Sequence, residues 1–151
     1  METTIVSYLA AWPSRDLIVA AHQQLTHEWW EHHRMNFEVF VSQLVVQEAS
    51  TGDQQASQRR LQIIKQLPLL EFTESAVALA RALVEEGPIP ERSVTDALHI
   101  AVATVHGMDF ILTWNCTHLA NATMRNGIMA VCRSHEYEPP VICTPEELME
   151  E

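Results

Sequence analysis

The sequence predicts an α/β fold in which a parallel sheet is flanked by helices on both faces, giving three α/β/α layers. Helical segments alternate along the chain with short apolar segments of the kind that form parallel strands. The most apolar of these, residues 110–114, has the nearly continuous hydrophobicity of a strand buried on both faces. The 151 residues, 47% of them hydrophobic, suit one domain spanning residues 1–151.

The first third of the chain predicts two helices separated by a strand. A helix capped by Ser14 is expected to run to about His33, because apolar residues recur there at helical spacing. Residues 37–41 are rich in aromatic and β-branched side chains and predict a strand. Ser42 is then expected to cap a short helix that carries Glu48.

The middle of the chain predicts two further helices around a short strand. The first helix covers about residues 55–66, and the strand covers residues 69–72. Thr73 is expected to cap a helix that ends near Glu86, before a Gly-Pro pair. Asp53 is interpreted as a solvated loop acid.

The last third continues the alternation. Ser93 or Thr95 is expected to cap a helix that Gly107 ends. After the strand at 110–114, another helix is expected to begin near Thr117. Residues 141–143 predict the final strand.

Composition constrains the setting in which the protein acts. The net charge is -11, with nine Lys and Arg against twenty Asp and Glu, whereas nucleic-acid-binding proteins usually have a basic face. A protein of this charge could hold a phosphate only if metal ions bridged it to carboxylates or a basic partner supplied the contacts. No apolar run approaches the ~20 residues that span a bilayer, so no membrane association is expected. Three cysteines without a pairing pattern favour a cytoplasmic location.

Four polar residues near the ends of predicted elements are candidates for chemistry: Glu2, Glu48, Asp96 and Asn115. Residues just past the carboxyl ends of parallel strands share one crevice. Carboxylates gathered there repel one another unless a cation neutralises them, and hard oxygen ligands select Mg²⁺ or Mn²⁺. Such a metal could activate water and stabilise the charge on a phosphate that is being displaced.

Each of these residues also has a purely structural interpretation. Asp96 would suit the first turn of a helix, where the helix dipole favours an acid, and Glu48 could be an exposed helical residue. His99 shares a helix face with Asp96, so it could contact the site, although the favoured interpretation is a packed core residue. Thr4 and Thr113 could donate hydrogen bonds to the carboxylates.

Two other kinds of site are disfavoured. The eight histidines do not group as zinc ligands do, and Cys116 and His118 stand apart from any matching pair. A nucleotide-binding α/β domain would need a glycine-rich phosphate loop, and the chain has only four glycines.

Residues 2–9 (ETTIVSYL), 42–48 (SQLVVQE) and 95–101 (TDALHIA) resemble the acidic motifs of the PIN-domain family, in particular the VapC-type toxins of type II toxin-antitoxin systems. Residues 111–115 (ILTWN) resemble the strand and motif that follow. The resemblance implies a PIN-like fold and a Mg²⁺- or Mn²⁺-dependent endoribonuclease that hydrolyses phosphodiester bonds with metal-activated water. It implies that Glu2, Glu48 and Asp96 are metal ligands, and that these three residues and Asn115, which would assist, are catalytic. It also implies an RNA substrate, a small antitoxin protein whose tail covers the site, and a homodimer.

The chain departs from the family pattern in three ways. The first acid is Glu2 where the family more often has Asp, and the fourth acidic position is the neutral Asn115. The family's first strand, normally central in the sheet, would precede Glu2, where this sequence has only Met1. We therefore expect either an upstream start or a sheet without that strand. These departures also support an alternative, a catalytically impaired PIN domain that acts as a protein-binding module.

Overall fold

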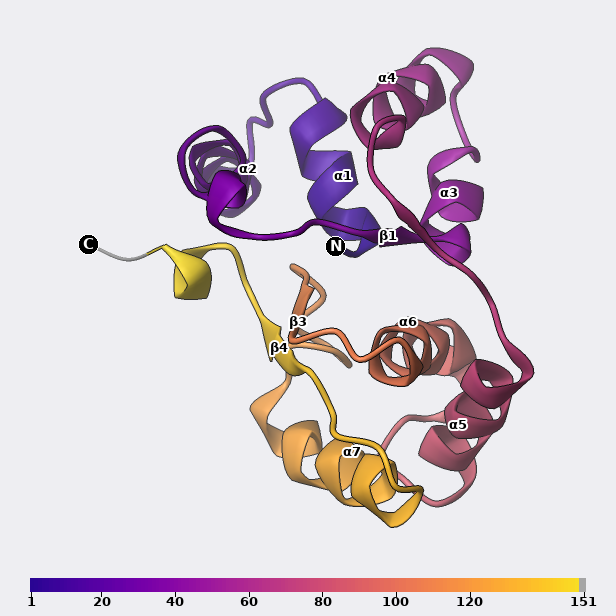
Figure 1. The fold of residues 1–151 in the computed structure, drawn as a ribbon. Helices are drawn as coiled ribbons and strands as arrows, with labels where there is room; N and C mark the ends of the chain where they lie inside the picture. Colours follow the sequence, from indigo (N-terminus) through magenta and orange to yellow (C-terminus); the bar gives the residue numbers. More distant parts are fainter. Residues whose placement is uncertain (150–151) are drawn as a thin grey trace.

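The computed structural model describes residues 1–149. The chain forms two groups of helices, with the N-terminus between them (Figure 1). The first group comprises α1 (Thr3–Ala10), α2 (Leu17–Glu28), β1 (Val41–Ser42), α3 (Gln43–Ala49), α4 (Gln54–Ile64) and β2 (Leu69–Leu70). The second comprises α5 (Glu74–Glu85), α6 (Val94–Val105), β3 (Phe110–Leu112), α7 (Ala122–Ser134) and β4 (Val141–Cys143). Short 3₁₀ turns cover Arg34–Asn36, Glu91–Ser93 and Glu146–Leu148. None of the described helices is long and apolar enough to cross a membrane.

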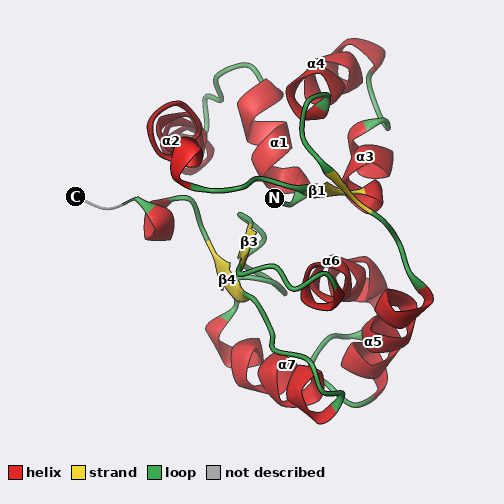
Figure 2. Ribbon diagram, in the orientation of Figure 1, coloured by secondary structure: helices red, strands yellow, loops and turns green. Residues whose placement is uncertain are grey.

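The strands pair in parallel, as predicted, but within residues 1–149 they form two separate two-stranded sheets. β1 pairs with β2, and β3 pairs with β4 (Figure 2). The backbone nitrogens of Met1 and Glu2 donate to Phe40 O, just before β1, at 2.8 Å and to Leu112 O of β3 at 3.0 Å. The described residues therefore do not form the single continuous sheet that the sequence predicts.

All the strands except β4 are shorter than predicted. Of residues 37–41 only Val41 is in a strand, and that strand, β1, extends one residue further to Ser42. Residues 69–72 contribute only Leu69–Leu70, and residues 110–114 contribute Phe110–Leu112. β-Branched and aromatic composition shows that a segment suits a sheet, but the paired length depends on the neighbouring strand. β4 has the predicted limits, residues 141–143.

The helix caps are partly as predicted. Ser42 accepts a hydrogen bond from the Val45 amide and Thr73 from the Ala76 amide, so both are caps. Ser14 is not the cap of α2, because Asp16 accepts from two amides of the first turn while Ser14 accepts from the Asp16 amide. The helix then continues through a π-helical turn to His33, where it was expected to end.

The remaining corrections concern three other helix starts. Asp53 is not a mere loop acid, because its carboxylate caps α4 by accepting from the Ala56 amide. Ser93 holds the cap position of α6, but its side chain makes no capping bond. The helix expected near Thr117 begins at Ala122 instead, capped by Asn121. Gly107 has φ +69°, the left-handed conformation that ends a helix, so its predicted role is confirmed.

Helix α1 lies between two parts of the hydrophobic core. Ile5 and Leu9 pack in a cluster with Trp29, Leu112 and Cys143. On the other side, Val6 packs in a cluster with β1, α3 and α4. A third and larger cluster fills the second group, between α5, α6, α7 and the β3–β4 pair. The burial of α1 on both sides fixes the position of the polar residues at its N-terminal end.

Gly87 follows α5 at a close backbone approach, which gives a test of the packing between α5 and α7. A Cβ atom there would lie 2.6 Å from the Leu83 carbonyl oxygen and 3.2 Å from the Val131 side chain. Gly87→Ala should therefore lower the free energy of unfolding by about 1–3 kcal/mol, because it overpacks a rigid contact. Chemical denaturation measures this, with the exposed Glu85→Ala as a control expected to stay within about 0.5 kcal/mol of the parent. Equal stability of the three proteins would contradict this packing.

Candidate functional site

Glu2 is a buried carboxylate at the N-terminal end of α1, with 6% of its surface exposed. Its Oε2 atom accepts from the Thr4 amide at 3.1 Å, the Thr4 hydroxyl at 2.5 Å and the Thr113 hydroxyl at 2.7 Å. The N-terminal end of a helix also favours negative charge. These donors hold one carboxylate oxygen, while the other, Oε1, lies 3.9 Å from Nε2 of His99.

Glu48 reaches the same point from α3. Its Oε1 atom accepts from the Thr3 hydroxyl at 2.7 Å and lies 2.7 Å from Nε2 of His99. Burial raises the pKa of Glu48, but the contacts with His99 and Thr3 outweigh burial, so the pKa lies below its ordinary value. Glu48 is therefore a carboxylate at neutral pH. Because its side chain contacts Thr3 and His99, the alternative interpretation of Glu48 as an exposed helical residue is wrong.

His99 lies on α6 and is 7% exposed, so its predicted burial is confirmed. It is not only a packing residue, however, because its ring faces both carboxylates. Although Nε2 is close to Glu48, it has no well-aligned hydrogen-bond partner among residues 1–149. One ligand atom from each of Glu2, Glu48 and His99 lies within 4.8 Å of the others. The three side chains, from three different segments, form a mixed oxygen and nitrogen cluster.

Asp96 lies in the first turn of α6, beside this cluster, and both of its carboxylate oxygens have partners. Asn115 Nδ2 donates to Asp96 Oδ1 at 2.9 Å, and His118 Nδ1 lies 2.7 Å from Oδ2. Asn115 Oδ1 in turn accepts from the Thr117 and His118 amides, each at 3.2 Å. This turn brings His118 to Asp96. The sequence does not indicate this contact, because the two residues are far apart in the chain.

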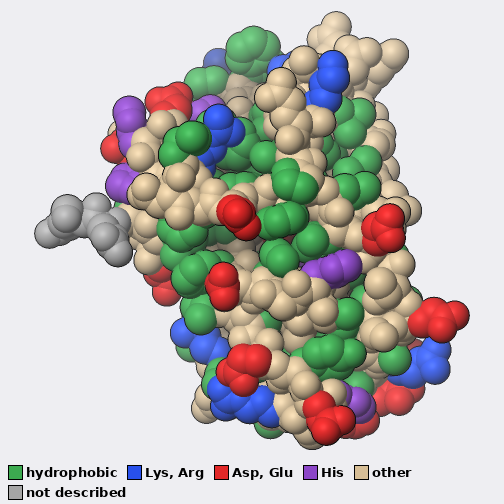
Figure 3. Space-filling model, in the orientation of Figure 1, with side chains coloured by type: hydrophobic (Ala, Val, Ile, Leu, Met, Phe, Trp, Pro, Cys, Tyr) green, Lys and Arg blue, Asp and Glu red, His purple; other side chains and the backbone are tan. Residues whose placement is uncertain are grey.

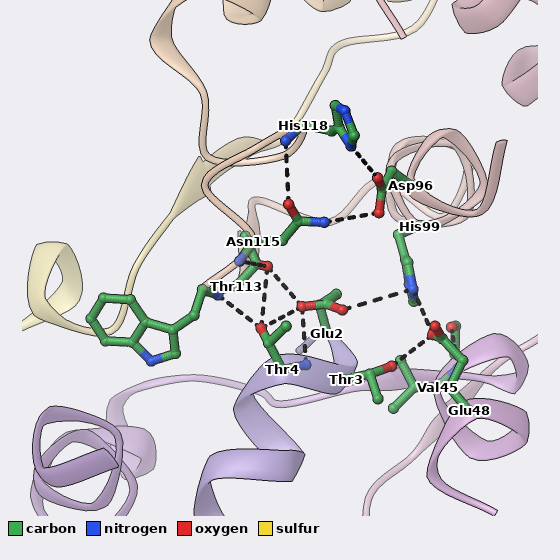
Figure 4. Close-up of polar contacts among 12 residues, drawn as sticks. Glu2, Thr3, Thr4, Val45, Glu48, Asp96, His99, Thr113, Asn115 and His118 are labelled. Carbon is green, nitrogen blue, oxygen red and sulfur yellow. Dashed lines mark hydrogen bonds and ion pairs between the residues drawn. The ribbon is translucent and has the colours of Figure 1, made fainter. Parts of the chain in front are cut away.

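Thr113 joins the two parts of the site, as Figure 4 shows. This fully buried residue follows β3, donates to Glu2 and accepts from the Asn115 amide at 2.9 Å. The expected bonding of Thr4 and Thr113 to a carboxylate is therefore present. Glu2 and Glu48 therefore meet at His99, while Asp96 and Asn115 are linked to Glu2 through Thr113 and lie outside the cluster of Glu2, Glu48 and His99.

The donor set suits a divalent cation. Two carboxylates within a few ångströms of each other repel unless a positive charge lies between them, and no Lys or Arg side chain is ion-paired with either among the described residues. Nε2 of His99, which has no aligned hydrogen-bond partner among residues 1–149, adds a third candidate ligand atom directed at the same point. Carboxylate oxygens suit Mg²⁺ and Mn²⁺, and an imidazole ligand shifts the preference toward Mn²⁺ and other transition metals.

The role of Thr113 can be tested by removing its hydroxyl. Thr113→Val keeps the shape but leaves the Asn115 amide without its acceptor and Glu2 without a donor, so stability should fall by about 1–3 kcal/mol. Thr95→Val is the control, because Thr95 is exposed on the first turn of α6. Thermal and denaturant unfolding of the three proteins decide the matter. A Thr113→Val protein as stable as Thr95→Val would mean that the network contributes little.

Comparison with known proteins identifies the family. A family model described as PIN domain matches residues 15–115, more than half of the chain. The match includes Glu48, Asp96 and Asn115, while Glu2 precedes it. No curated protein and no solved structure matches the chain significantly. The chain therefore belongs to the PIN domain family, which has a nuclease-type fold and whose members are generally metal-dependent nucleases.

Proposed function

We propose that this protein is a metal-dependent endoribonuclease, the toxin of a toxin-antitoxin pair, which hydrolyses RNA phosphodiester bonds. The observation that carries the proposal is the convergence of Glu2, Glu48 and His99, joined through Thr113 to Asp96 and Asn115. Membership of the PIN domain family supports it, because the residues that meet here are those that resemble the family's acidic motifs.

The cation would be Mg²⁺ or Mn²⁺, held by Glu2, Glu48 and Asp96, and we add His99 to this set. When bound, such an ion activates water and neutralises charge on a phosphate under attack. The protein's part is to hold the carboxylates in place. Three donors fix Oε2 of Glu2, so that Oε1 faces His99 and Glu48.

The second part of the site orients Asp96. Asn115 and His118 each contact one carboxylate oxygen of Asp96, and these two contacts fix the plane of the carboxylate. Such outer contacts typically change metal affinity or activity by about 10–100-fold when they are removed. Asn115 therefore acts in this proposal as a positioning residue for Asp96 rather than as a fourth acid.

The charge of -11 bears on how RNA would be held. Figure 3 shows hydrophobic side chains through the middle of one face, with Lys and Arg side chains mainly toward its margins. A cation between carboxylate and phosphate would supply the central contact. A small basic antitoxin, and a second copy of the chain in a homodimer, are the partners we propose.

The net charge of -11 also supports the alternative function, an impaired PIN domain that binds proteins. A Mn²⁺-dependent cleavage assay on a mixed RNA pool separates the endoribonuclease from the protein-binding module.

Asp96→Asn should lower Mn²⁺-dependent RNA cleavage about 100-fold or more, because it removes a carboxylate charge from the site. The fold should persist within about 1 kcal/mol, since an amide can still accept from Asn115 and donate to His118. Thermal unfolding and the cleavage assay are run on the same preparations.

Asp53→Asn is the matched control for this change. It alters the net charge equally, and asparagine can replace the exposed N-cap of α4. The control should cleave RNA like the parent. If Asp96→Asn also cleaves like the parent and binds Mn²⁺ equally, Asp96 does not belong to the site. If the parent itself neither binds Mn²⁺ nor cleaves, the protein-binding alternative gains support.

His99→Gln should lower Mn²⁺ affinity about 10-fold or more, because a nitrogen ligand is lost. Pulsed electron paramagnetic resonance gives a readout that does not depend on activity, since an imidazole ligand produces ¹⁴N coupling to bound Mn²⁺. The coupling should be present in the parent and in His32→Gln, an exposed-histidine control, and absent in His99→Gln. Equal coupling in all three proteins would remove His99 from the ligand set.

A further inference from the structure

The loop between α1 and α2 presents a tryptophan to solvent. Trp12 is 75% exposed, whereas tryptophan side chains are on average largely buried. The loop is nevertheless held by a buried residue of α2, because Gln23 Nε2 donates to the Trp12 carbonyl at 3.1 Å and Gln23 Oε1 accepts from the Ser14 amide at 2.9 Å. The exposure of Trp12 is therefore set by the fold and not by a loosely attached loop.

One face of the Trp12 ring is covered by a cation. The guanidinium carbon of Arg59, on α4, lies over the ring, 5.2 Å from its centroid. Arg59 Nε donates to the Ala10 carbonyl at the end of α1, at 3.1 Å, and this is the only hydrogen bond of the Arg59 side chain within residues 1–149. Figure 1 shows α1 between α2 and α4, so Trp12 and Arg59 meet at the end of α1. The second face of the ring is open to a ligand.

The charges around Trp12 favour an anionic ligand. Arg15, in the same loop, is exposed, and neither it nor Arg59 has an ion-pair partner among residues 1–149. The one acid of the loop, Asp16, accepts from two amides of the first turn of α2. An exposed aromatic ring beside arginines is the combination with which proteins hold unpaired nucleobases and their phosphates.

A row of aromatic rings connects this surface with the candidate site. Trp114 directly follows the site residue Thr113 in the chain. His22 stacks on Trp114, with ring centroids 3.9 Å apart and planes at 10°, and the Tyr8 ring lies 6.2 Å from that of His22. Tyr8 is on α1, four residues before Trp12. The rings therefore extend from the site along α1, the helix that ends just before Trp12.

We propose that Trp12 and Arg59 bind an unpaired nucleobase of the RNA strand that is cut at the candidate site. The inference rests on the proposed endoribonuclease function, and it names the substrate class, single-stranded RNA. Only an unpaired base can leave its own stack and lie on the open face of a protein ring, with Arg59 supporting the opposite face. This contact would supply part of the RNA binding that a net charge of -11 otherwise disfavours.

The length of α1 predicts which base is bound. Its eight residues span about 12 Å, and they separate Trp12 from the N-terminal end of the helix, where Glu2 lies. Stacked nucleotides follow one another at about 3.4 Å along a strand, and unstacked nucleotides lie further apart. The base on Trp12 should therefore lie within about four nucleotides of the bond that is cut.

The test uses a short single-stranded RNA whose cut position is first mapped with Mn²⁺, together with copies that each lack one base. Binding is then measured in EDTA by fluorescence anisotropy. Removal of one base near the cut should raise the Kd of the parent about 10-fold, and Trp12→Ala should raise the Kd of the intact RNA equally. In Trp12→Ala, removal of that base should have no further effect. Trp12→Phe, which keeps a ring, should lose less affinity than Trp12→Ala.

Leu17→Ala is the matched control, because Leu17 is an apolar residue at the start of α2 that is 86% exposed. It should bind RNA within about twofold of the parent, since no base stacks on a leucine. An equal loss in Leu17→Ala and Trp12→Ala would overturn the proposal, because it indicates a general apolar surface of the kind that binds proteins. Arg59→Gln should weaken binding of every oligonucleotide and lower its salt dependence, and Arg133→Gln on α7 should do neither.

The two measurements separate this inference from the proposed function. If the parent cleaves RNA with Mn²⁺ but Trp12→Ala binds RNA like the parent, the nucleobase site is wrong and the endoribonuclease stands. If the parent binds single-stranded RNA through Trp12 but cleaves none, the endoribonuclease is wrong and the nucleobase site stands.

Discussion

A carboxylate removed from water must be held by hydrogen-bond donors, and the site is arranged around this requirement at Glu2. Its donors come from the first turn of α1 and from Thr113, which follows β3. Because these segments are more than a hundred residues apart, the bonds tie the start of the chain to the second group of helices. The Thr113 hydroxyl also accepts a hydrogen bond from the Asn115 amide. The same network therefore fixes the turn that faces Asp96.

The second constraint is mutual repulsion among acids. Glu2 and Glu48 approach the same point from different segments, and His99 lies between them without a well-aligned hydrogen bond. Two carboxylates so close together repel one another, and a cation between them would relieve that repulsion. Glu2 and His99 also line a mainly apolar pocket of about 540 Å³, so the cluster lies at the edge of a space that partly shields its charges from water.

The sequence was sufficient for the parts of the fold that depend on local chemistry. Ser42 and Thr73 were recognised as caps because a hydroxyl that bonds to an amide three residues ahead acts within one turn. Ser14 was chosen wrongly because Asp16, two residues later, is an equally good acceptor and only the backbone path decides between them. Strand lengths were overestimated because pairing depends on distant neighbours. Spacing indicates that His99 could contact the site, because it shares a helix face with Asp96, but the contact of His118 with Asp96 depends on tertiary structure and no spacing indicates it.

Asn115 shows why a departure from a family pattern need not weaken a site. An aspartate there would place a second carboxylate where Nδ2 now lies, 2.9 Å from Asp96 Oδ1, and the two charges would repel. Asparagine supplies a donor instead. Its orientation is fixed by its surroundings, because Oδ1 accepts from the Thr117 and His118 amides and only Nδ2 remains to face Asp96. Asparagine in place of aspartate thus exchanges one negative charge for a fixed geometry of the Asp96 carboxylate.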